Sequence, residues 1–255
     1  MKLFIKQGME HLRPFIESLP RLFDAGEGEL LFKGRNTIRA FEVAGTALAV
    51  KQFRAPSGIN ALLYGHLRKS KAQRAFENGA RLAALAIPTP APIAWAECYR
   101  GGRLQCSFLV TLRSTYHDLK LVTEAFPAPH TLPVLDGFAA FTAMLHEKGV
   151  MHGDFNNSNT QWFEEADGTI RFELIDINRM QFKGRPLTRR ERLHNLRRLT
   201  CQLTAYTYIL RSYGRLIGWH ERYSQIDSAE ELIRFIRKRD RKRNFKRWLK
   251  GEQKK

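Results

Sequence analysis

The sequence has little of what marks several classes of protein. Its three cysteines show no C-x-x-C spacing, so we expect reduced, half-buried thiols and neither a disulfide framework nor a metal site. No apolar run reaches the roughly 18 residues that span a bilayer, and the N-terminus lacks the apolar core of a signal peptide. We find no internal repeat and no low-complexity linker. The protein is therefore expected to fold as a globular chain and to work in the cytoplasm.

Acidic residues are also scarce relative to basic ones. The chain has 43 Lys and Arg residues against 25 Asp and Glu residues, which gives a formal net charge of +18. This imbalance favours an anionic partner such as a nucleotide, a nucleic acid or a phosphorylated lipid surface. With 255 residues, 43% of them hydrophobic, the chain is long enough to bury one large core or two small ones.

The most informative stretch reads His152-Gly153-Asp154-Phe155-Asn156-Asn157-Ser158-Asn159. An aspartate two positions after a histidine and five positions before an asparagine has the spacing of a kinase catalytic loop. Phosphoryl transfer needs a group that accepts the hydroxyl proton and oxygen ligands that hold Mg²⁺ against the triphosphate. We therefore interpret Asp154 as the catalytic base, and Asn159 and the later Asp176 as metal ligands.

Other residues of this stretch allow plainer interpretations. His152 is expected to brace the loop rather than to act as an acid or a base. Asn156 and Asn157 either contact substrate or only favour a turn.

The elements expected around this stretch follow the order of a kinase fold. A buried helix over 132–148 precedes it, and a hairpin that turns at Asp167-Gly168 brings Asp176 back beside Asn159. Residues 1–24 resemble a short amphipathic lead-in, and 188–213 a single long helix. Upstream of the loop, five runs with strand character predict an antiparallel sheet: 30–32, 38–43, 48–53, 93–99 and 104–111.

The predicted fold class is therefore α+β, a two-lobed protein-kinase-like fold in one domain overall. Residues 1–111 would form a small antiparallel β N-lobe with its N-terminal lead-in. Residues 112–255 would form a mainly helical C-lobe, with 112–115 as the hinge beside the nucleotide.

Lys51 lies on the strand over 48–53, where its apolar neighbours point inward and the lysine faces the other way. This matches the strand whose lysine holds the α and β phosphates of a nucleotide. A helix over 70–86 carries Glu77, which would pair with Lys51 and fix it toward the phosphates. The alternatives are a solvated lysine on an amphipathic strand and a glutamate paired within its own helix.

Departures from a protein kinase indicate a different acceptor. Only Gly34 stands between the first two strands, where a glycine-rich phosphate loop is expected. About a dozen residues separate Asp176 from the helix that begins near Thr188, too few for an activation segment that docks a peptide. The acceptor is therefore expected to be a small molecule or a lipid headgroup. Asn178 replaces the usual glycine after Asp176, and we expect it to take the left-handed backbone of that turn.

Two motifs carry a family resemblance: His152 to Asn159, and Asp176-Ile177-Asn178-Arg179-Met180. With Lys51 and Glu77 upstream, they resemble the Kdo/WaaP family of lipopolysaccharide inner-core kinases. The similarity runs from about Glu29 to Tyr213.

The resemblance implies a bacterial enzyme that uses ATP and Mg²⁺ to phosphorylate a Kdo or heptose hydroxyl of the lipid A inner core. It would be peripheral at the cytoplasmic face of the inner membrane. Lys51 would then bind nucleotide phosphates and Glu77 would position it. Asp154 would be the base, and Asn159 and Asp176 would bind the metal.

Other interpretations stay open. The H-G-D loop is shared with aminoglycoside-type phosphotransferases, and the charge would also suit a non-catalytic protein that binds nucleic acid or membrane. No nucleic-acid module is visible, so we expect no nucleic-acid partner, and Lys51, Asp154 and Asp176 argue against a pseudokinase scaffold. The basic run 237–250 predicts a helix that lies on an anionic membrane or is merely solvated. Arg179 would meet the anionic groups of the acceptor or form an internal salt bridge. The sequence leaves the oligomeric state open.

Overall fold

The structure, a computed structural model, describes residues 1–54, 69–199 and 201–220, and further on 227, 229–231, 233, 234, 236–238 and 241. It divides into two compact units. Unit 1 contains Met1–Tyr116 and Glu173–Met180, and unit 2 contains His117–Phe172 and Gln181–Lys255. The sequence-based prediction placed Glu173–Met180 in the second lobe, whereas here the segment packs with unit 1. Most of the predicted basic helix over 237–250 lies outside the described residues.

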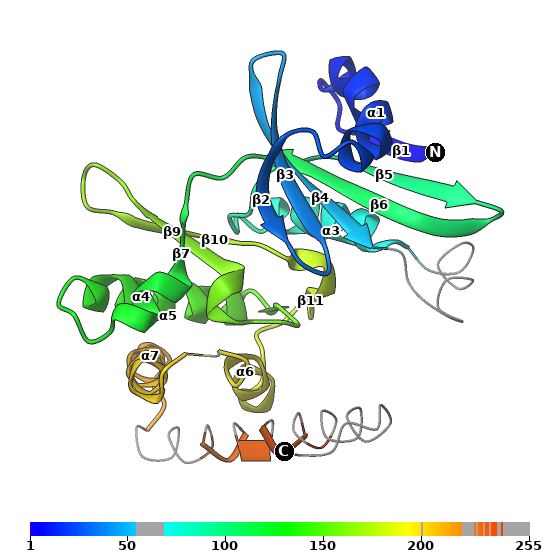
Figure 1. Ribbon diagram of the computed structural model, residues 1–255. Helices are drawn as coiled ribbons and strands as arrows, with labels where there is room; N and C mark the ends of the chain where they lie inside the picture. Colours follow the sequence, from blue (N-terminus) through cyan, green and yellow to red (C-terminus); the bar gives the residue numbers. More distant parts are fainter. Residues whose placement is uncertain are drawn as a thin grey trace, which may run out of the picture. The chain divides into compact units, whose positions relative to one another are not determined.

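Unit 1 is built on an antiparallel sheet with the strand order β1-β5-β6-β4-β3-β2 (Figure 1). The five predicted strands all form, and β1 adds a sixth within the described part of the chain because it pairs with Ala94–Glu97 of β5. Four residues are too few to give a strand periodicity, so β1 was missed. The strands are β1 (Lys2–Ile5), β2 (Glu29–Lys33), β3 (Thr37–Val43), β4 (Thr46–Arg54), β5 (Pro92–Arg100) and β6 (Arg103–Leu112).

Helix α1 (Arg13–Asp24), after a 3-10 turn at Glu10–Leu12, covers one face of this sheet (Figure 1). Its apolar residues recur at helical spacing and pack on alternate residues of β4, Leu48 and Val50. Because side chains alternate across a strand, Lys51 points to the opposite face. Helix α3 (Lys71–Ala84) packs against β5 and β6 and against the 3-10 turn at Ile177–Arg179. The side chain of Ser70 caps this helix by accepting from the backbone of Gln73.

Unit 2 is mainly helical and is organised around α5 (Thr131–Glu147), which packs against α4 (Leu119–Ala125) and α7 (Leu203–Leu216). Phe138 and Leu135 of α5 are fully buried. The short strands are β7 (His117–Asp118), β8 (Val150–Met151), β9 (Thr160–Glu164), β10 (Ile170–Leu174) and β11 (Gln181–Phe182). Within the described ranges no helix has both the length and the apolar character needed to cross a bilayer.

The single helix predicted over 188–213 is wrong. The structure has two helices there, α6 (Arg189–Leu196) and α7 (Leu203–Leu216). Each helix buries its own face: α6 buries Asn195 and Leu196, and α7 buries Tyr206 and Ile209. The apolar spacing continues through the break between the helices, so the sequence pattern did not show it.

Gly149, two residues after the end of α5, has a backbone that excludes a side chain. Its φ is +71°, and a Cβ added there would collide with the carbonyl oxygen of Arg185. We expect Gly149→Ala to lower the free energy of unfolding by about 2–4 kcal/mol, because left-handed strain and backbone overlap act together. Urea denaturation measures this change.

Gly168→Ala is the matched control for this prediction. Gly168 also has a left-handed φ, +81°, but nothing lies within 4 Å of an added Cβ. Its substitution should cost about 1 kcal/mol, the backbone contribution alone. Equal losses for the two variants would contradict the overlap at Gly149.

Candidate active site

The catalytic stretch forms a tight loop in unit 2 between β8 and β9. Gly153 has a φ of +49°, which explains why glycine stands where a protein kinase has arginine. The Asp154 amide donates to the His152 carbonyl, and the Asn156 amide donates to the Asp154 carbonyl over 3.0 Å. The backbone therefore closes around Asp154.

Side chains on both sides of Asp154 anchor this loop. Phe155 is fully buried and stacks on Phe138 of α5, with ring centroids 5.6 Å apart. Asn157 is buried and donates to Thr123 Oγ1 of α4 over 2.7 Å, while Asn156 Oδ1 accepts from the Ser158 amide. Both asparagines thus hold the turn.

Asn159 binds the backbone of the residue five positions before it. Its Nδ2 donates to the Asp154 carbonyl over 2.8 Å, and no hydrogen bond of its Oδ1 is found among the described residues. The amide nitrogen is engaged, so the oxygen is the atom left to act as a ligand. This fits the predicted role, because Mg²⁺ prefers hard oxygen ligands.

Arg198 is a neighbour of Asp154 that the sequence did not reveal. Its Nη1 lies 3.2 Å from Asp154 Oδ1, within unit 2. The two residues are 44 positions apart, and no local spacing links them. In the sequence, the arginine pair at 197–198 after a helix indicates only surface charge.

In unit 1, Lys51 of β4 forms an ion pair with Asp176, with 2.9 Å between Lys51 Nζ and Asp176 Oδ1. Only 19% of the Lys51 side chain is exposed, so the solvated-lysine alternative does not describe it. Asn178 Nδ2 donates to the same carboxylate oxygen over 2.7 Å.

The left-handed residue of this turn is Asp176 itself, with a φ of +55°, so the expectation for Asn178 is wrong. An aspartate tolerates this conformation better than most residues, and the Asn178 side chain stabilises it by a hydrogen bond. Strained backbone of this kind persists where the surroundings hold it, often at functional sites.

Hydrogen bonds from several parts of unit 1 hold the backbone around Asp176 in place. Thr89 Oγ1 donates to the Leu174 carbonyl over 2.7 Å, and Asn78 Nδ2 of α3 donates to the Ile177 carbonyl over 2.8 Å. Ser114 donates to Glu173, where burial raises the carboxyl pKa. These contacts explain why Glu173–Met180 belongs to unit 1.

The predicted pair of Glu77 with Lys51 is not formed in this structure. Among the described residues, Glu77 pairs with Lys69, whose Nζ lies 2.7 Å and 2.8 Å from its two oxygens. Gln73 also donates to Glu77 over 3.2 Å. Lys69 stands just before the first turn of α3 and reaches along the helix, while Asp176 takes the ammonium of Lys51.

Positive charge gathers around Asp176 in unit 1. Burial lowers the pKa of Lys71, and the nearby charges of Arg35, Arg179 and Arg74 lower it further, while Asp176 opposes the shift. This identifies a basic environment suited to phosphate groups. Arg35 lies between β2 and β3, where the glycine-rich loop of a protein kinase covers the nucleotide phosphates.

Metal binding is consistent with these donors. Asp176 of unit 1 has a carboxylate and Asn159 of unit 2 an amide oxygen, and both are oxygen donors of the kind that Mg²⁺ prefers. Across the described part of the chain, no three His, Cys, Asp or Glu residues gather as a protein-only metal site.

Many solved structures share this fold, among them two that cover most of this chain. One is titled WaaP in complex with acyl carrier protein, with a TM-score of 0.61, 20% identity, and coverage of 94% of this chain and 99% of that one. The other is an aminoglycoside-3'-phosphotransferase of type VIII, with a TM-score of 0.52, 16% identity, and coverage of 85% and 98%. No curated protein matches the chain.

The sequence profile of a family decides the assignment. Residues 59–225 match the lipopolysaccharide kinase (Kdo/WaaP) family, and this range contains Asp154, Asn159 and Asp176. The match covers more than half of the chain, and the predicted α+β kinase-like fold is confirmed. The chain therefore belongs to the lipopolysaccharide kinase (Kdo/WaaP) family.

Proposed function

We propose that this protein transfers the γ-phosphoryl group of ATP to a sugar hydroxyl, on Kdo or heptose, of the lipid A inner core. The observation that carries the proposal is the family match over residues 59–225, which includes both aspartate motifs. The reaction class is phosphotransfer to an alcohol. The acceptor is the lipid A-core glycolipid.

Asp154 is the base in this proposal. Its carboxylate accepts the proton of the acceptor hydroxyl as that oxygen attacks the γ-phosphorus, and the bond to the β-γ bridging oxygen breaks. The loop is pinned by Phe155 and Asn157, so the carboxylate is placed without a further ordering step.

Lys51 and Asp176 serve the nucleotide. Lys51 would bind the α and β phosphates, and Asn159 and Asp176 would hold Mg²⁺, which would neutralise charge on the phosphates. In the structure Lys51 Nζ lies 2.9 Å from Asp176 Oδ1, which holds the ammonium beside the proposed metal ligand. The basic surroundings of Lys71 support this nucleotide site.

The acceptor also agrees with the charge of the chain. A formal net charge of +18 favours binding at an anionic headgroup surface, where each basic residue contributes about 1 kcal/mol. We place the protein peripherally at the cytoplasmic face of the inner membrane, with no nucleic-acid partner. Lipid A phosphates are negatively charged, as that surface is.

An aminoglycoside is the second candidate acceptor. The H-G-D sequence at His152 to Asp154 is shared with that class of phosphotransferase, and the fold resembles a type VIII enzyme. At 16% identity that resemblance supports the fold and not the acceptor.

Transfer from labelled ATP to a panel of acceptors separates these candidates. Kdo-lipid A in mixed micelles and several aminoglycosides are offered to wild type, Asp154→Ala and Asp176→Ala. Asp167→Asn, at an exposed turn, is the control for loss of a carboxylate. We expect label in the lipid with wild type and the control only. Label in an aminoglycoside instead of the lipid would replace the proposed acceptor with the second one.

A further inference from the structure

We propose that Arg198 is the positioning residue for Asp154. This inference rests on the proposed function, in which Asp154 is the base. The guanidinium Nη1 lies 3.2 Å from Asp154 Oδ1, and the side chains are 28% and 34% exposed. The pair is therefore half-buried, and it includes the carboxylate that accepts the proton of the acceptor hydroxyl in the proposal.

Arg198 stands in the turn directly after α6, and the backbone of that turn is fixed. The Arg198 amide donates to the Asn195 carbonyl over 3.2 Å, and the Leu199 amide donates to the Leu196 carbonyl over 3.0 Å. Leu196 and Leu199 are buried. The base of the arginine side chain is thus held by packing.

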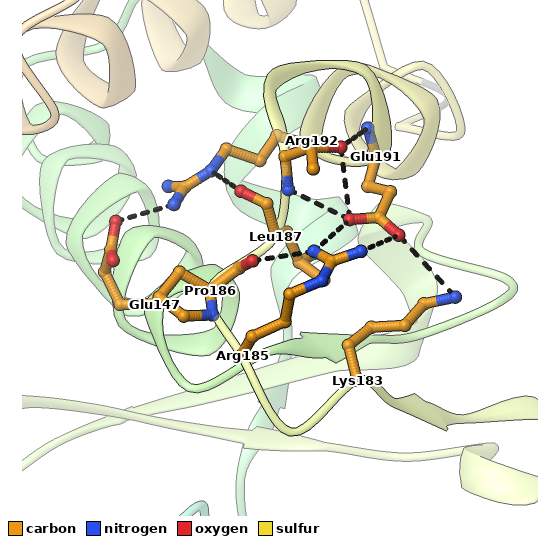
Figure 2. A network of polar contacts seen from close by, with 8 residues as sticks. Glu147, Lys183, Arg185, Pro186, Leu187, Glu191 and Arg192 are labelled. Carbon is orange, nitrogen blue, oxygen red and sulfur yellow. Dashed lines mark hydrogen bonds and ion pairs between the residues drawn. The ribbon is translucent and has the colours of Figure 1, made fainter.

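Helix α6 is in turn secured at its start by a network of charges (Figure 2). Thr188 and Glu191 form a capping box, and both Arg185 guanidinium nitrogens reach Glu191 over 2.9 Å and 3.2 Å. The hydrogen bond from Arg185, followed by those from Thr188, lowers the pKa of the Glu191 carboxyl to about 2. Lys183 also lies 3.7 Å from Glu191. The network fixes where α6 begins.

Arg192 connects α6 to the end of α5 (Figure 2). It donates to the Leu187 carbonyl and to Glu147, each over 2.7 Å. Arg192 is buried, so its bond to the Leu187 carbonyl is shielded from water, whereas Glu147 is exposed. The chain runs from the end of α5 through β8 into the catalytic loop, so the helix that precedes Arg198 and the loop that bears Asp154 share one support.

A buried histidine completes this support. His146 of α5 contacts Tyr213 Oη of α7 over 2.8 Å and Asn195 of α6 over 3.0 Å. Burial, helped by the charge of Arg192, lowers the His146 pKa to about 3, so the ring is neutral at pH 7. The histidine therefore joins three helices without adding a charge near Asp154.

A positive charge beside Asp154 would favour the approach of the base to the phosphoryl group. The base must approach a phosphoryl group that carries several negative charges, and a neighbouring guanidinium offsets that repulsion. The planar guanidinium also fixes the rotation of a carboxylate, which the point charge of a lysine does less well. In this proposal Arg198 acts on the reaction through its contact with Asp154.

Four variants test this role in the full chain: Arg198→Ala, Arg198→Lys, Asp154→Asn and the double variant Arg198→Ala with Asp154→Asn. Arg190→Gln, at an exposed position of α6 just before that turn, is the control for loss of one positive charge. We expect Arg198→Ala to lower kcat about tenfold to hundredfold, with the KM for ATP within about twofold of wild type. Arg198→Lys should recover part of the loss.

The double variant separates positioning from other effects. When Asp154 is already asparagine, Arg198→Ala should lower kcat no further, because the arginine acts through that carboxylate. A full additional loss there would overturn the proposal, as would a kcat for Arg198→Ala equal to that of Arg190→Gln. The latter is expected of an exposed ion pair worth about 0–1 kcal/mol.

A spectroscopic measurement keeps this test independent of the acceptor. With ¹³Cγ-labelled aspartate, the Asp154 resonance is assigned by its loss in Asp154→Asn. At pH 7 it should move in Arg198→Ala and stay in place in Arg190→Gln. A resonance that stays in place in both variants sinks the inference. If wild type phosphorylates no acceptor, the proposed function fails while this resonance still decides the role of Arg198.

Discussion

Replacing Asp154 with asparagine should lower kcat for phosphoryl transfer about 10²- to 10⁴-fold, the usual contribution of a positioned general base. Asparagine has nearly the same shape but cannot accept the hydroxyl proton at neutral pH. The loop should keep its conformation, because Asn159 binds the backbone carbonyl of residue 154 and not its side chain. Steady-state transfer at saturating ATP measures the loss.

Two controls make this result specific. Asp167→Asn removes a carboxylate from an exposed turn and should retain full activity. Thermal unfolding and ATP binding of Asp154→Asn should match those of wild type. A kcat within about tenfold of wild type would show that Asp154 is not the base.

Asp176→Asn should lower kcat about 10²- to 10³-fold, as expected for removal of a charged group that stabilises the transferred phosphoryl. The amide can still accept from Lys51 and Asn178, so the turn should persist. A neutral amide is a weaker Mg²⁺ ligand than a carboxylate, so the concentration of Mg²⁺ that gives half-maximal rate should rise. Initial rates over a Mg²⁺ titration, with ATP in its metal complex, measure both effects.

The matched control for Asp176→Asn is Asp24→Asn, an exposed carboxylate at the end of α1 in the same unit. It should leave both the rate and the Mg²⁺ titration unchanged. If Asp176→Asn kept the Mg²⁺ requirement of wild type, Asp176 would not be a metal ligand. If its rate also fell, the role of Asp176 would be limited to holding Lys51.

The features that the sequence predicted are those with local causes. Asp154 and Asn159 lie five positions apart in one loop, and a hairpin with a clear turn at Asp167-Gly168 leads to Asp176. Five strands and α5 have regular hydrophobic periods. Spacing and period were therefore enough for the fold class and for the order of the motifs.

The features that the sequence missed depend on contacts between distant residues. Arg198 reaches Asp154 across 44 positions, and the bonds from Asn78 and Thr89 to the Asp176 segment cross 99 and 85 positions. Glu77 pairs with Lys69, which lies closer to it along the chain than Lys51 does. Periodicity carries no information about such partners, since each contact depends on how whole elements pack.

The structure of the product lipid shows whether the protein phosphorylates an inner-core sugar. Kdo-lipid A is incubated with Mg-ATP and wild-type protein, and the purified lipid is examined by mass spectrometry and ³¹P NMR. We expect one added phosphomonoester on an inner-core sugar with wild type and none with Asp154→Asn. ADP formation with an unmodified lipid, or phosphate added equally by Asp154→Asn, would rule out the proposed function.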